Sequence, residues 1–170
     1  MPGTPVRTAA GRMLLQRAKR ALIEAMRGER AALARFARAV DAFPIPIGLF
    51  SNLVASHGDA LDLKRGGIFP IVHGVRALAL ERGLLETGTV ARLARLADEG
   101  ALSHDLAREV TQALHYLMTL RLDAQLAAAS GGLAPRAELS TMERDLLRDA
   151  FRIVKQLREV VRRHFNLAMF

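Results

Sequence analysis

Residues 103–129 read SHDLAREVTQALHYLMTLRLDAQLAAA, and residues 140–165 read STMERDLLRDAFRIVKQLREVVRRHF. In both stretches apolar residues recur every three to four positions, the spacing that predicts an amphipathic helix. Ser103 can cap the first helix, and Asp105 lies in its positive first turn. Ser140 and Glu143 form a capping box at the start of the second. Because the loop between them is short, we expect an antiparallel pair of long helices.

Further helices must cover the apolar stripes of this pair. Leu, Ala, Arg and Glu are abundant, and all four favour helix, whereas aromatic residues make up only 5% of the chain. Pro44 and Pro46 end one helix, Thr89 caps another, and Gly100 ends that one. The fold class is therefore predicted to be all-α, a bundle of about six helices. Before residue 103 we expect helices over residues 11–26, 29–43, 48–56 (short), 70–83 and 89–99.

The chain is expected to divide near Gly28. Residues 1–28 form an N-terminal helix, which we expect to be loosely attached, and residues 29–170 form the main helical domain. The chain has no cysteine, which excludes disulfides, thiolate metal sites and a cysteine nucleophile. No apolar run is long enough to span a bilayer, and no signal peptide is recognised, so we expect a cytoplasmic protein.

Arginine dominates the charge, with 22 of the 25 basic residues against 17 acidic ones, for a net charge of +8. Such a balance fits an anionic partner, or simply an arginine-rich surface. The basic residues are spread along all the expected helices, which argues against nucleic acid as the first candidate.

The most promising chemistry lies in residues 61–70, LDLKRGGIFP, where two cations and two glycines directly precede an expected helix. Glycines let backbone amides approach a ligand, and a helix start carries unpaired amides and partial positive charge. Lys64 and Arg65 add full charges. The combination of Lys64, Arg65, Gly66 and Gly67 predicts an anion site, although solvated cations at the start of a helix would give the same pattern.

Longer motifs link this turn to a known family. Residues 62–80, DLKRGGIFPIVHGVRALAL, resemble the hallmark stretch of the nucleotidyltransferase substrate-binding domain of bacterial proteins. Residues 46–50, 86–93 and 139–165 also resemble that family, and the likeness covers about residues 31–165. More distantly, the glycine turn and residues 116–122, YLMTLRL, are similar to the helical domains of PII-uridylyltransferase and glutamine-synthetase adenylyltransferase.

The resemblance implies a noncatalytic helical domain, with a role in signal transduction as a further expectation. It would pack on a nucleotidyltransferase core, in the same polypeptide or on a separate chain, and help bind a nucleotide triphosphate or the acceptor. No cofactor is expected in this chain, and Mg²⁺ is expected with the nucleotide in the partner catalytic domain. A basic helical module that binds nucleic acid or protein is the alternative, and the oligomeric state is left open.

No catalytic or metal-binding residue is predicted. The five histidines lack metal-ligand spacing, and Asp59 and Asp62 lack the carboxylate pattern with which nucleotidyltransferases hold two metal ions. Arg121 falls inside the apolar arc of its helix, so it needs Asp62, Glu86 or a ligand phosphate as partner. The predicted substrate- or nucleotide-binding residues are Asp62, Lys64, Arg65, Gly66, Gly67, His73, Arg76 and Arg121.

Overall fold

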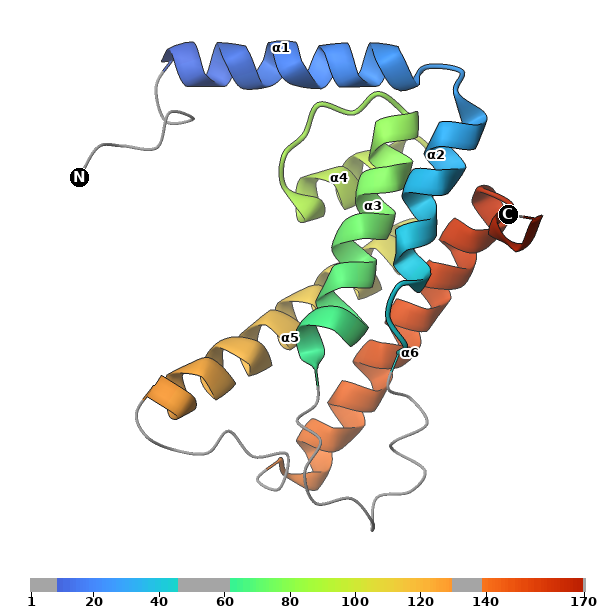
Figure 1. Ribbon diagram of the computed structural model, residues 1–170. Coiled ribbons are helices and arrows are strands. Elements are labelled where there is room, and N and C mark those ends of the chain that lie inside the picture. The colour runs from blue at the N-terminus through green and yellow to red at the C-terminus, as the bar shows by residue number, and fades with distance from the viewer. Residues whose placement is uncertain (1–8, 46–61, 130–138, 170) are drawn as a thin grey trace.

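The computed structural model describes residues 9–45, 62–129 and 139–169. These residues form helices and no strand, which confirms the all-α prediction (Figure 1). In chain order the elements are α1 (Ala9–Met26), α2 (Arg30–Ala37), the 3₁₀ turn η2 (Arg38–Asp41), the π-helical turn η4 (Lys64–Ile68), α3 (Phe69–Glu81), α4 (Thr89–Asp98), α5 (His104–Ala129), α6 (Thr141–His164) and the 3₁₀ turn η6 (Leu167–Met169).

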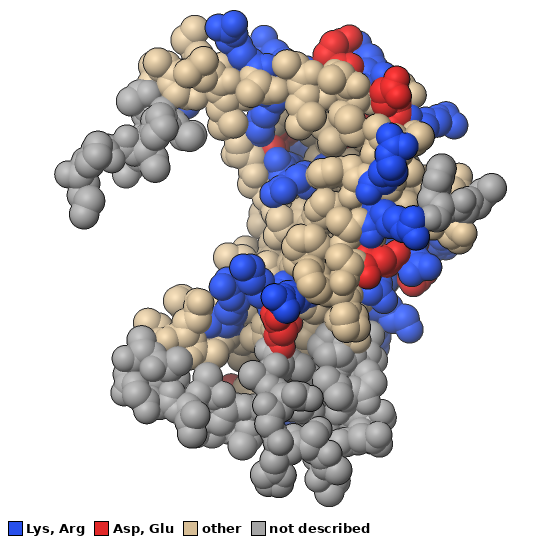
Figure 2. Space-filling model, in the orientation of Figure 1, with Lys and Arg blue, Asp and Glu red and all other residues tan. Residues whose placement is uncertain are grey.

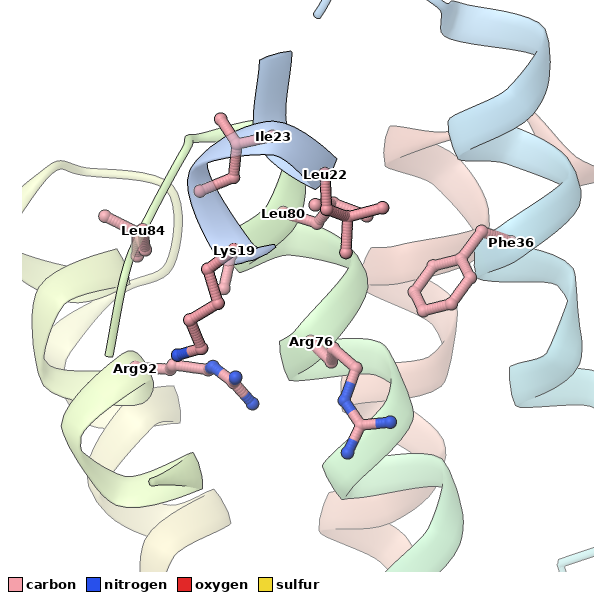
Figure 3. A pocket seen from close by; sticks show the side chains of 9 residues that line it. Lys19, Leu22, Ile23, Phe36, Arg76, Leu80, Leu84 and Arg92 are labelled. Carbon is pink, nitrogen blue, oxygen red and sulfur yellow. The ribbon is translucent and has the colours of Figure 1, made fainter. Parts of the chain in front are cut away.

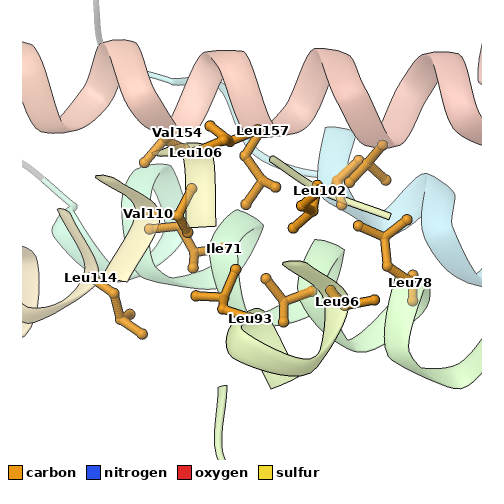
Figure 4. Close-up of a cluster of buried hydrophobic side chains, with 14 of the residues drawn as sticks. Ile71, Leu78, Leu93, Leu96, Leu102, Leu106, Val110, Leu114, Val154 and Leu157 are labelled. Carbon is orange, nitrogen blue, oxygen red and sulfur yellow. The ribbon is translucent and has the colours of Figure 1, made fainter. Parts of the chain in front are cut away.

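Helix α3 is the centre of the bundle. Eight of its thirteen residues are buried, so it must be covered on most sides, and it contacts α2, α4 and α6. Ile71 and Val75 are wholly buried, and they meet apolar side chains of α4, α5 and α6 in one continuous core (Figure 4). The antiparallel pair α5 and α6 closes this core, as the two long amphipathic stretches predict.

Capping explains where several helices begin and end. The Ser140 side chain accepts from the Glu143 amide at 3.2 Å, and the Glu143 carboxylate accepts from the Ser140 amide at 2.7 Å, so the capping box is confirmed. Ser103 accepts from the Leu106 amide at the start of α5. Gly100 ends α4 with φ +69°, a left-handed conformation that glycine adopts without strain. The predicted cap at Thr89 is wrong, because Gly88 holds that position.

Helix α1 lies across one end of the bundle, over α3 and α4 (Figure 1). Lys19 fastens it there by donating to the backbone carbonyls of Leu85 and Glu86, in the segment between α3 and α4. Much of α1 is exposed, including Met13 and Leu14. Whether residues 1–28 are separable from the rest stays a prediction. The short helix expected over 48–56 and the loop at 130–135 lie outside the described residues.

Candidate anion-binding face

Helix α3 begins at Phe69 with Pro70 in its first turn, as expected, but a further helical turn precedes it. Leu63 is already helical, and the turn Lys64–Ile68 is π-helical and runs directly into α3. The Phe69 amide donates to the Lys64 carbonyl, one residue further back than in an α-helix. A proline ring clashes with the carbonyl four residues before it, and the wider turn ahead of Pro70 is a way to relieve that clash.

The two glycines therefore have a structural reason in addition to any ligand. The Gly66 amide donates to the Asp62 carbonyl at 2.9 Å, so it is used within the helix. Gly67 is buried, and a Cβ there would lie 2.8 Å from Leu117 Cδ1 and 3.2 Å from Phe151 Cε1. Only glycine lets this turn approach α5 and α6 so closely. That these two amides contact a ligand stays a prediction.

The predicted charges of the turn lie at its surface. Asp62 accepts from the Arg65 amide at 2.9 Å and so caps the new helix start, where an anion was expected. The Arg65 guanidinium lies 3.5 Å from the same carboxylate and 5.5 Å from the ring centre of Phe43. Lys64 is exposed, and its side chain forms no ion pair or hydrogen bond with another described residue. The turn thus presents one cation that is unpaired among the described residues and one cation that is partly neutralised.

His73 and Arg121 lie on different helices, α3 and α5. His73 is buried, donates from Nε2 to the Phe36 carbonyl at 2.7 Å and stacks on Phe69, so its contacts are those of a core residue. Arg121 is half-exposed rather than buried. Both carboxylates considered as its partners are paired elsewhere, Asp62 with Arg65 and Glu86 with Arg95.

Arg76 is the predicted site residue that lines a pocket. It lies twelve positions after Lys64, roughly 18 Å along a helix, so the two side chains do not converge on one small ligand group. The pocket lies beneath α1 and holds about 440 Å³ of empty space, including the part open to solvent. Its lining comes from α1, α2, α3, α4 and the segment between α3 and α4: Lys19, Leu22, Ile23, Phe36, Arg76, Ala79, Leu80, Leu84 and Arg92.

Three cations meet around this mostly apolar pocket. Figure 3 shows Lys19 from α1 beside Arg92 from α4, with Arg76 of α3 turned toward the same space. Lys19 Nζ and Arg92 Nε both donate to the Glu86 carbonyl, at 3.0 and 2.9 Å, so one carbonyl oxygen holds two like charges together. Figure 2 shows the face below α1 hollowed, with Lys and Arg side chains in the recess.

The electrostatics of the pocket favour an anion. Burial lowers the pKa of Lys19, and the neighbouring charge of Arg92 lowers it further against the opposing effect of Glu86. Burial also lowers the pKa of Arg92, followed by repulsion from Arg76. The nearby Glu86 carboxylate lies 3.5 Å from Arg95 Nε, so it is shared with a fourth cation. The group keeps a positive excess that an anionic ligand would relieve.

Sequence reasoning missed Lys19 and Arg92 as site residues. Lys19 lies in the N-terminal helix, where no motif drew attention, and it reaches the pocket only through the packing of α1. Arg92 belongs to residues 86–93, a stretch quoted for the family resemblance, so that resemblance was the available clue.

The described residues form neither a metal-ligand cluster nor a membrane-spanning helix. Among them no three His, Asp or Glu side chains gather as a metal site. None of the described helices is both long and apolar enough to cross a membrane.

Comparison with known proteins identifies the family. The family described as "Putative nucleotidyltransferase substrate binding domain" matches residues 30–165, so the chain belongs to that family, as its motifs indicated. The match leaves α1 outside, although α1 supplies one wall of the pocket. Searches of curated proteins and of solved structures found no match.

Proposed function

We propose that this member of the nucleotidyltransferase substrate-binding family is a noncatalytic domain that binds a nucleotide triphosphate or an acceptor substrate. It would do so on the hollowed basic face beneath α1, next to a nucleotidyltransferase core that supplies the catalytic carboxylates and the Mg²⁺. The observation that carries the proposal is the pocket in which Lys19, Arg76 and Arg92 surround an apolar floor. Ligand pockets typically combine an apolar lining with a few converging polar groups in this way.

A partner domain has a surface available to it on α5. Met118, Leu122 and Leu126 follow one another at four-residue spacing and are 53 to 57% exposed, although each is a large apolar side chain. Residues four apart share one face of a helix, so the three form a stripe. Exposed apolar stripes of this kind are typical of surfaces that another protein covers. We propose that the catalytic core, on the same or a separate chain, packs there.

The glycine turn belongs to the same proposal. Lys64 and Arg65, with Arg121 on α5, would form a second basic group on the substrate-binding domain, suited to the other substrate of a two-substrate reaction. Changing both Lys64 and Arg65 to Ala should barely change thermal stability, because both side chains are exposed. The change should lower nucleotide transfer by the cognate core when the two proteins are recombined. A large loss of stability would instead mean that the pair is structural.

The alternative function is a basic module that binds nucleic acid. The net charge of +8 supports it, whereas the apolar floor of the pocket favours a small ligand. Isothermal titration separates the two, with ATP, UTP and CTP in one series and duplex DNA and RNA at two salt concentrations in the other. Nucleotide binding supports the proposal. Steeply salt-dependent binding of DNA or RNA, with no nucleotide binding, would replace it with the alternative.

A cytoplasmic location and a part in signal transduction go with this proposal.

A further inference from the structure

The pocket beneath α1 joins charge and apolar surface in a way that selects a ligand class. On one side Leu22, Ile23, Leu80 and Leu84 present aliphatic surface, and on the other Lys19, Arg76 and Arg92 present cations (Figure 3). Leu22 is 53% exposed, although it lines the pocket, so a ligand there would cover apolar surface that now meets water. An inorganic anion would contact the cations but would leave the apolar surface exposed to water.

The three cations are positioned to contact a bound anion. Lys19 and Arg92 are fixed by the Glu86 carbonyl, and Arg76 is exposed with no recorded partner among the described residues. Arg92 bonds the carbonyl through Nε, and in Figure 3 its terminal nitrogens turn toward Arg76. A guanidinium presents two such nitrogens as a fork that matches phosphate oxygens. Two arginines and a lysine around one opening therefore suit a phosphate group with more than one charge.

We infer that this pocket binds a nucleoside phosphate, with the ring system against Leu22 and Leu80 and the phosphates between Lys19, Arg76 and Arg92. The inference rests on the proposed function and goes further by choosing the nucleotide over the acceptor and by placing its ring and its phosphates in the pocket. It also gives α1, which lies outside the family match, a role in closing the site.

The test measures ATP binding to the full chain by isothermal titration, beside tripolyphosphate and adenosine. ATP should bind at least about tenfold more tightly than either fragment, since each fragment keeps only one kind of contact. Arg76→Gln should weaken ATP binding about tenfold or more, the usual effect of losing one charge-assisted contact. Arg152→Gln is the control: it removes the same charge from an exposed position on α6, and Arg152 is not part of the pocket lining.

A second pair of variants tests the apolar side. Leu22→Ser should weaken ATP binding and leave tripolyphosphate binding unchanged, whereas Leu14→Ser, exposed on the same helix but absent from the lining, should change neither. If ATP binds but Arg76→Gln and Leu22→Ser both bind it as wild type does, the placement of the ligand in this pocket is wrong, here and in the proposed function, while nucleotide binding by the domain stands. If wild type binds none of ATP, UTP and CTP, both the pocket assignment and nucleotide binding by this domain are wrong.

Discussion

Gly67→Ala tests whether the glycine turn serves packing. The new Cβ would lie 2.8 Å from Leu117 Cδ1 and 3.2 Å from Phe151 Cε1, and both of those side chains are wholly buried. Overpacking a core in this way costs about 1–3 kcal/mol, and the better helix propensity of alanine returns about 1 kcal/mol. With so little room to shift, we expect a net loss of about 1–2 kcal/mol, and each kcal/mol should lower the melting temperature by about 2–4 °C for a chain of this size.

Urea unfolding followed by circular dichroism measures this loss, with two comparisons. Gly88→Ala is the control for added volume, since a Cβ there meets nothing within 4 Å, and it should cost less than about 1 kcal/mol, the loss from a poorer N-cap. In a Leu117→Ala background the obstructing methyl groups are gone, so Gly67→Ala should become neutral or stabilising. If Gly67→Ala is as stable as wild type on its own, or if its cost is the same in both backgrounds, close packing is not why glycine stands there.

Four further predictions concern other parts of the chain. Ser140→Ala should cost about 1 kcal/mol of stability at neutral pH, measured by urea unfolding, because it removes the cap of α6. The Ser140 side chain, and then its backbone, hold the pKa of Glu143 below its usual range, so this stabilisation is present above the unfolded-state pKa and is lost as pH falls through the folded-state pKa. Glu143→Gln should therefore flatten the acid side of a curve of stability against pH. An unchanged curve would contradict this. Asp41→Asn should destabilise the protein by about 1–2 kcal/mol, measured by thermal melts, because Arg158 and Arg162 both lie within 4 Å of the Asp41 carboxylate and Arg158 is mostly buried. A melting temperature equal to that of wild type would show that these ion pairs contribute nothing to stability. The chain alone, given labelled ATP, UTP or CTP with Mg²⁺ and candidate acceptors, should form no labelled product, and multiple turnover would refute a noncatalytic role.

Periodicity and capping were enough to predict most of the helices. The 3.6-residue repeats of α5 and α6 are strong, and a capping box depends only on residues three apart, so both can be recognised without tertiary structure. Pro70 marks the first turn of α3, as predicted, but the helical turn ahead of it was not expected. The structure shows a π turn before it, stabilised by packing of Gly67 against Leu117 and Phe151, which local sequence does not reveal.

The pocket was harder to predict for the same reason. Lys19 and Arg92 are far apart in sequence and meet only because α1 lies across α3 and α4. Arg76 was singled out because it lies off the apolar stripe of α3, a property of one helix. A site assembled from three helices depends on how they pack, and amphipathic patterns do not fix that arrangement.

The central claim is that the basic hollow beneath α1 binds the substrate. Its most direct test is a titration of the nitrogen-15-labelled chain with ATP, followed by the shifts of the backbone amide signals. The largest shifts should fall on residues 19–23, 76–84 and 92, which line or border the pocket, while the exposed face of α6 around Arg152 stays unchanged. Shifts gathered on that face of α6, or no shift at saturating ATP, would contradict the claim.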